Sequence, residues 1–158
     1  MDNREKFTIR VYGIVINRQN EVLVTDEYHF NRRMTKFPGG GMEYGEGTLD
    51  CLKREFLEEL GQEPVNIRHF YTTDFFQPTA LVDPPRQLIS IYYLASLPDP
   101  EGLVVKKKPF DLQEVNGTLV FRWIPLSRLI AEEMTFPVDK VVTALLLEQW
   151  AAQQISTP

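Results

Sequence analysis

Three carboxylates stand close together in the middle of the chain, in the stretch PGGGMEYGEGTLDCLKREFLEELGQ of residues 38–62. If this stretch is helical, at about 100° per residue, Glu55, Glu58 and Glu59 fall at i, i+3 and i+4 and share one face. Like charges this close repel one another, so the pattern indicates a face that binds a cation. Because the donors are all carboxylate oxygens, a hard divalent ion is favoured, Mg²⁺ or Mn²⁺.

The residues around the three acids bear on this interpretation. A glycine run, residues 39–41, follows Pro38, and glycine lets the backbone approach a ligand closely or expose a carbonyl oxygen to a metal. Leu49, Leu52, Phe56 and Leu60 form an apolar stripe opposite the acids. The alternative is a solvated acidic face on an amphipathic helix, which would be the better interpretation if the three acids stood alone.

The spacing from Gly40 to Gly61 resembles the Nudix box. It reads as Gly, five residues, Glu, seven residues, Arg-Glu, an apolar residue, any residue, Glu-Glu, any residue, Gly. All eight fixed positions are filled, by Gly40, Glu46, Arg54, Glu55, Phe56, Glu58, Glu59 and Gly61. Gln62 departs from the family, which usually has an aliphatic residue at this position.

The resemblance implies the α/β fold of Nudix domains, an α/β/α sandwich with a mixed β-sheet. A length of 158 residues suits a single domain, residues 1–158, with its core at about 7–153.

The resemblance also implies an enzyme, a Mg²⁺-dependent hydrolase that cleaves a pyrophosphate linkage. Glu55, Glu58 and Glu59, with the Gly40 carbonyl, would hold the metal, and Arg54 would position a carboxylate of the box. Nudix enzymes often supply a further acid from the region before the last strand, and Glu114 is the candidate here. The residues expected to serve catalysis are therefore Glu58, Glu55, Glu59, Arg54 and Glu114.

The substrate is less sharply indicated. Nudix enzymes similar to ADP-ribose pyrophosphatases carry a proline about sixteen residues beyond the box, where Pro78 stands, so the first interpretation is an ADP-ribose-like nucleoside diphosphate derivative or a nucleotide sugar. Phe76 would stack on a base, and Arg32 and Arg33 would bind phosphates or simply lie on a solvated surface. Two alternatives stay open: a nucleoside triphosphate, including an oxidised deoxynucleotide, and a non-catalytic domain that senses nucleotides.

The composition of the chain limits the kinds of partner and the cellular location that are expected. A net charge of −5 gives no reason to expect a stable nucleic-acid partner, so a small nucleotide is the expected one. Cys51 is the only cysteine, which excludes an intramolecular disulfide. The sequence shows neither a signal peptide nor an apolar run that could span a membrane, so a cytoplasmic location and no membrane partner are expected, and a homodimer stays open.

Periodicity and turn residues predict the remaining elements. Strands are expected at residues 8–16 and 22–24, as a hairpin, followed by a polar loop at 26–36. The box helix should begin with Thr48 as its N-cap and stop at Gly61. A strand at 64–76 should pair with one at 87–97 across a proline-rich loop, and a last strand at 119–124 should lead to a short helix at 126–132 and a C-terminal helix that follows Pro137.

Overall fold

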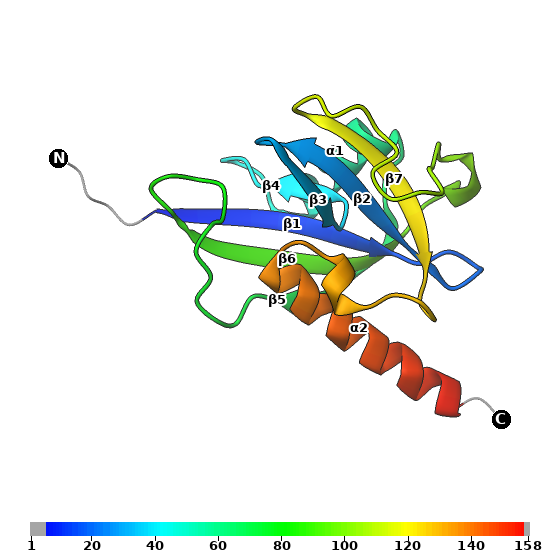
Figure 1. Cartoon of the computed structure of the whole chain (residues 1–158). Coiled ribbons are helices and arrows are strands. Elements are labelled where there is room, and N and C mark those ends of the chain that lie inside the picture. The colour runs from blue at the N-terminus through cyan, green and yellow to red at the C-terminus, as the bar shows by residue number, and fades with distance from the viewer. Residues whose placement is uncertain (1–5, 157–158) are drawn as a thin grey trace. The chain divides into compact units, whose positions relative to one another are not determined.

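The computed structural model describes residues 6–156 and divides into two compact units, each built from two separate segments of the chain. Unit 1 comprises the described residues up to Val15 together with Pro38–Glu101, and unit 2 comprises Ile16–Phe37 together with the residues from Gly102 onward. Figure 1 shows the elements in chain order.

Unit 1 is a four-stranded mixed sheet with one helix. Its strands are β1 (Phe7–Val15), β4 (Gly39–Gly41), β5 (Val65–Thr72) and β6 (Gln87–Ser96), in the order β4-β1-β6-β5. The β1 and β6 strands pair in parallel along their length, whereas β4 and β5 are antiparallel to their neighbours. The predicted antiparallel pairing of β5 with β6 is confirmed.

The helix of unit 1, α1 (Thr48–Leu60), packs its apolar stripe into the core. Leu52, Phe56 and Leu60 are buried as predicted, while Leu49 is 46% exposed. A Cβ on Gly13 would lie 2.2 Å from Cζ of Phe56, so the glycine of β1 makes room for the aromatic ring. This close approach fixes α1 against β1.

Both ends of α1 are capped, although not as the sequence predicted at the first turn. The N-cap is Gly47 and not Thr48, and the Asp50 carboxylate accepts the Gly47 N–H at 3.0 Å. At the other end Gly61 adopts a left-handed conformation (φ 69°), and its N–H donates to the Leu57 carbonyl at 3.1 Å. Gln62 follows, and its side-chain amide exchanges hydrogen bonds with the backbone of Asp99 (2.6 and 2.9 Å), which gives this polar residue a structural role where an aliphatic one is usual.

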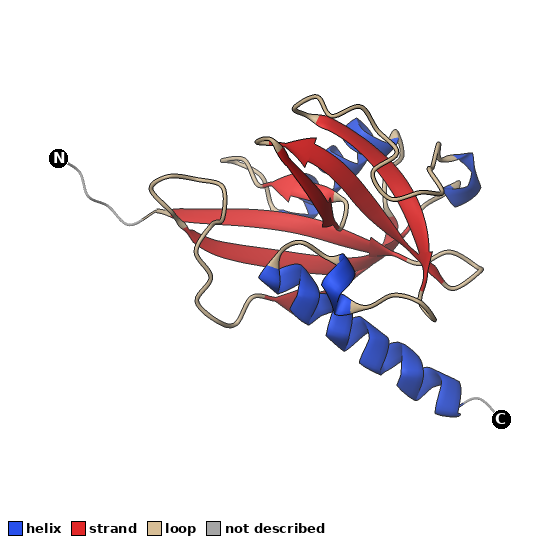
Figure 2. Cartoon of the chain, in the orientation of Figure 1, coloured by secondary structure: helices blue, strands red, loops and turns tan. Residues whose placement is uncertain are grey.

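Unit 2 is a three-stranded antiparallel sheet with a long C-terminal helix. Its elements are β2 (Glu21–His29), β3 (Arg32–Lys36), β7 (Thr118–Pro125), the 3₁₀ turn η2 (Ala131–Glu133) and α2 (Pro137–Ser156), and the sheet order is β3-β2-β7. A further 3₁₀ turn, η1 (Pro100–Gly102), lies where the chain leaves unit 1. Figure 2 shows α1 and α2 as the two substantial helices among the strands, so the predicted α/β class with a mixed sheet is confirmed.

Three predictions about local structure are wrong. Residues 26–36 are not a polar loop but complete β2 and form β3, because their charged side chains are paired inside unit 2. The hairpin predicted from strands at 8–16 and 22–24 is wrong beyond a single antiparallel bridge of Ile16 with Val22, since β1 and β2 belong to different sheets. The helix predicted at 126–132 is replaced by turns, in which the Arg128 and Leu129 N–H groups donate to the Pro125 carbonyl, and by η2.

The predicted C-terminal helix is present, and it begins at Pro137 itself and not after this residue. Within residues 6–156, no helix is both long and apolar enough to cross a membrane.

Candidate functional site

Arg54 is the centre of an acidic cluster on α1. Its Nη2 donates to the Glu46 carboxylate and to the Gly41 carbonyl, both at 3.0 Å, and its Nε donates to the same carboxylate. Its Nη1 donates to Glu55 (2.9 Å) and reaches Glu58 (3.4 Å). One guanidinium therefore orients the box carboxylates and ties α1 to β4.

Gly40 and Glu55 are in direct contact. A Cβ on Gly40 would lie 2.5 Å from both Cδ and Oε1 of Glu55, so only glycine leaves room for this carboxylate. The side chain of Glu55 is 14% exposed, whereas that of Glu58 is 59% exposed. The Gly40 carbonyl, predicted to bind metal, has the Cys51 thiol as a neighbour at 3.9 Å.

Glu46 and Arg54 stabilise each other in their charged forms. Hydrogen bonds from the Arg54 guanidinium and from the Glu43 backbone lower the pKa of Glu46 from its ordinary 4.5 to about 2. The same Glu46 hydrogen bond raises the pKa of Arg54. Burial, followed by the Glu46 charge, raises the pKa of the Cys51 thiol to about 11, so the thiol stays protonated at neutral pH.

The donor atoms of the box are of the type that hard divalent cations prefer. They are carboxylate oxygens, and Glu55 is held against the backbone of the glycine run, where a carbonyl is close at hand. In residues 6–156, however, no three His, Cys, Asp or Glu side chains converge on one point as they stand, and the cation among the acids is Arg54. Glu59, the third predicted ligand, lies beside Glu58 on α1 and is partly buried.

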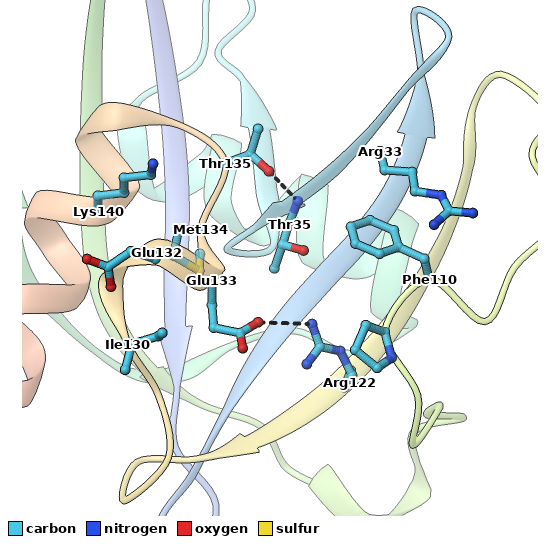
Figure 3. A pocket seen from close by; sticks show the side chains of 11 residues that line it. Arg33, Thr35, Phe110, Arg122, Ile130, Glu132, Glu133, Met134, Thr135 and Lys140 are labelled. Carbon is cyan, nitrogen blue, oxygen red and sulfur yellow. Dashed lines mark hydrogen bonds and ion pairs between the residues drawn. The ribbon is translucent and has the colours of Figure 1, made fainter.

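A pocket of about 520 Å³ lies within unit 2 (Figure 3), a volume in the range of small-molecule sites. Its walls come from β3, β7, η2 and the loop before β7. The lining side chains are Arg33, Thr35, Pro109, Phe110, Arg122, Ile130, Glu132, Glu133, Met134, Thr135 and Lys140.

A buried carboxylate joins three walls of this pocket. Asp26 is fully buried and accepts four hydrogen bonds, from the Thr35 hydroxyl (2.8 Å), the Phe110 N–H (3.2 Å) and the Nε and Nη2 of Arg122 (2.8 and 3.1 Å). Such a carboxylate has all its lone pairs engaged. It fixes Arg122, which is itself 7% exposed, at the base of the pocket.

The residues predicted to bind substrate are dispersed. Arg33 lines the unit 2 pocket, stacks over Phe110 (5.6 Å to the ring centroid) and pairs with Glu114, the predicted additional acid. Arg32 is exposed on β3 and is not part of the pocket lining.

The two residues predicted in the proline-rich loop lie in unit 1. Phe76 is 71% exposed, and Pro78 forms an isolated bridge with Gln87.

Sequence reasoning missed Asp26 and Arg122 as site residues. Asp26 lies in the segment predicted to be a polar loop, 26–36, and Arg122 lies in the predicted last strand, 119–124. The available signal was a charge inside an apolar strand pattern, Leu119–Ile124, because such a charge needs a buried partner.

A family model, the NUDIX domain, matches residues 6–146 of the chain. An RNA pyrophosphohydrolase of Francisella tularensis subsp. mediasiatica is 26% identical over 139 residues, which cover 82% of this chain and 88% of that protein. An RNA pyrophosphohydrolase of Bartonella bacilliformis is 34% identical over 61 residues, 34% of this chain and 36% of its own length.

Solved structures share the fold. One from a study of MutT from Aliivibrio salmonicida and Vibrio cholerae superposes with a TM-score of 0.65 at 21% identity and covers 91% of this chain and 99% of its own. A NUDIX hydrolase from Nitrosomonas europaea superposes with a TM-score of 0.64 at 15% identity and covers 94% of this chain and 90% of its own.

Proposed function

The chain belongs to the Nudix family and is a pyrophosphohydrolase, and we propose that it cleaves a phosphoanhydride bond of a nucleotide that carries a 5′ di- or triphosphate. The observation that carries the proposal is the Arg54 cluster, which holds Glu46, Glu55 and Glu58 in one network. The name of the Francisella relative supports a 5′-triphosphate, free or at the end of an RNA, as the leading substrate.

The acids of the box supply the reactive site in this proposal. Glu55, Glu58 and Glu59, with the Gly40 carbonyl, would hold Mg²⁺, and a bound Mg²⁺ neutralises charge on the pyrophosphate and acidifies a water. Arg54 acts as a positioning residue, because it touches the carboxylates and not the reacting atoms.

Two carboxylates are candidates for the base that takes the proton of the attacking water. Glu114 is engaged by Arg33, so it would have to leave this ion pair before it could accept a proton. Glu58 is well exposed and reaches Arg54 only at 3.4 Å, which makes it the better placed of the two.

The unit 2 pocket has the features that a nucleobase needs. Phe110 and Ile130 offer apolar surface, and Arg122 and Glu133 offer a donor and an acceptor. We propose that this pocket binds a nucleobase.

An ADP-ribose-like substrate remains the second candidate, and the position of Pro78 beyond the box favours it. A panel of ADP-ribose, a nucleotide sugar, nucleoside triphosphates and a 5′-triphosphorylated RNA, assayed with Mg²⁺ and with EDTA, tests both candidates. Triphosphates should release pyrophosphate or phosphate, whereas ADP-ribose should yield AMP and ribose phosphate. No turnover of any compound with Mg²⁺ present would contradict the proposed activity.

A further inference from the structure

We propose that Arg122 and Glu133 make the unit 2 pocket selective for guanine, an inference that rests on the proposed function because it specifies which nucleobase that pocket binds. It starts from the way Asp26 binds Arg122. The two carboxylate oxygens of Asp26 take the side edge of the guanidinium, Nε at 2.8 Å and Nη2 at 3.1 Å.

This pairing leaves the opposite edge of the same guanidinium, Nη1 with the second N–H of Nη2, for a ligand. Within the described part of the chain, Nη1 has no hydrogen-bond partner, and the Arg122 side chain is 8% exposed. The edge is planar and cannot swing away, because Asp26 is fully buried and holds it. Arg122 is therefore a rigid two-donor fork.

A carboxylate stands next to this fork. Oε2 of Glu133 lies 4.0 Å from Nη2 of Arg122, and the Glu133 side chain is 40% exposed, so a ligand can reach it. Figure 3 shows Glu133 pointing toward Arg122, whereas the carboxylate of the neighbouring Glu132 points away. The pocket thus presents two donors beside two acceptor oxygens.

Guanine has the complementary order of groups around its rim. N7 and O6 are two neighbouring acceptors that suit an arginine fork, and N1–H and N2–H₂ are two neighbouring donors that suit a carboxylate. Adenine carries the N6–H₂ donor beside N7, which would face the fork with a like group, and it has no paired donors for Glu133. Guanine is the only common base that satisfies both side chains at once.

The hydroxyl groups in the pocket do not compete for this role. The Thr35 hydroxyl donates to Asp26 at 2.8 Å, and the Thr135 hydroxyl accepts the Thr35 N–H at 2.8 Å. Arg33 is paired with Glu114. Arg122 and Glu133 are therefore the adjacent donor and acceptor groups on which the proposed base discrimination rests, while Phe110 offers apolar surface to the ring.

Binding of GMP and AMP to the full chain, measured by titration calorimetry in EDTA, tests the proposal without depending on catalysis. We expect GMP to bind at least about tenfold more tightly than AMP. Arg122→Lys keeps the charge beside Asp26 but loses the fork, so it should weaken GMP about tenfold and leave AMP within about twofold. Glu133→Gln, outside the buried network, should reduce the same preference and serves if Arg122→Lys does not fold.

Glu132→Gln is the matched control, because it removes the same charge from the same pocket away from Arg122. Its ratio of GMP to AMP affinity should stay within about twofold of wild type. Equal affinities for GMP and AMP, no binding at millimolar GMP, or an unchanged ratio in both the Arg122 and Glu133 variants would overturn the proposal.

The failure of this proposal is distinguishable from failure of the proposed function. A chain that hydrolyses GTP and ATP equally and binds their monophosphates equally is a pyrophosphohydrolase without guanine selectivity. A chain that hydrolyses no nucleotide and still prefers GMP keeps the guanine site and loses the assigned activity.

Discussion

Arg54 in unit 1 and Arg122 in unit 2 both lie among carboxylates. They differ in the number of carboxylates around the guanidinium and in how exposed these are. Arg54 in unit 1 has four carboxylates within 4.0 Å, those of Glu43, Glu46, Glu55 and Glu58. Arg122 in unit 2 is bound on one edge by the buried Asp26 and has Glu133 at 4.0 Å.

The first cluster carries an excess of negative charge and is partly open, since Glu43 and Glu58 are 70% and 59% exposed. Such a cluster suits further cations. In the second cluster two carboxylates face one guanidinium, and the Asp26–Arg122 pair is closed, at 0% and 7% exposed, so the donors of Arg122 are fixed and suit a neutral group with a defined pattern of hydrogen bonds. Arg54 thus holds a group of negative charges together, whereas Arg122 presents hydrogen-bond donors in a fixed geometry.

The largest effect on stability is expected from the closed cluster. Asp26→Asn leaves the buried Arg122 without its counter-charge, and breaking such a pair should lower the free energy of unfolding by about 3–5 kcal/mol. Urea denaturation at neutral pH measures it. Asp111→Asn is the control, because this exposed acid lies 3.9 Å from Lys106 and should cost under about 1 kcal/mol. Equal losses in the two variants would break the comparison.

The open cluster should show the reverse, a large loss of activity with little loss of stability. Glu58→Gln should lower turnover at saturating Mg²⁺ by roughly 10²-fold, about 2.7 kcal/mol in the barrier, because an amide holds a divalent cation poorly. The exposed Glu58 side chain allows the amide to be accommodated without unfolding. Glu63→Gln, just outside the box, should retain wild-type turnover. A Glu58→Gln rate within about threefold of wild type would contradict the assignment.

A substitution in the glycine run should have an intermediate effect. Gly40→Ala would place a Cβ 2.5 Å from the Glu55 carboxylate and should lower the free energy of unfolding by about 1–3 kcal/mol, with lower turnover, since Glu55 must move. Gly41→Ala is matched, because its Cβ would meet only Nη1 of Arg10 at 3.8 Å. Thermal melting and turnover of the two variants should separate clearly, and similar values for both would argue against a role for the Gly40 contact.

The smallest effect concerns pH. The pKa of Glu46 is lowered from 4.5 to about 2, so its contribution to stability is complete above pH 4.5 and is lost as pH falls toward 2. Glu46→Gln should therefore flatten the decline in unfolding free energy across this window. Glu43→Gln should follow the wild-type curve, and a Glu46→Gln curve parallel to wild type would show that the Arg54 contact does not set the acid limb.

The parts of the molecule that the sequence predicted are those that depend on near neighbours. The C-terminal end of α1 follows from Gly61, and the shared face of the box acids follows from helical spacing, so much of the Arg54 cluster could be predicted, whereas the N-cap is Gly47 and not the predicted Thr48. The family supplied the rest of that prediction through eight fixed positions.

The parts that were missed depend on distant residues. The sequence predicts a loop at Asp26 because its partner, Arg122, is 96 positions away and the pairing of the two cannot be seen in the local pattern. Glu27 and Lys36 reinforced the error, since the sequence does not reveal that they pair at 2.5 Å with side chains only 13% and 10% exposed. A charge pair buried between strands resembles a polar loop until the pairing is known.

The connections of Asp26 also bear on how the chain is made. Its donors lie at Thr35, Phe110 and Arg122, separations of 9, 84 and 96 residues, and the whole of Pro38–Glu101 between them belongs to the other unit. During synthesis from the N-terminus, Asp26 is therefore made nearly a hundred residues before Arg122, the cation that neutralises it. A chain that ends before β7 lacks both the third strand of the unit 2 sheet and the cation that neutralises Asp26, so unit 2 cannot complete its fold until β7 has been made.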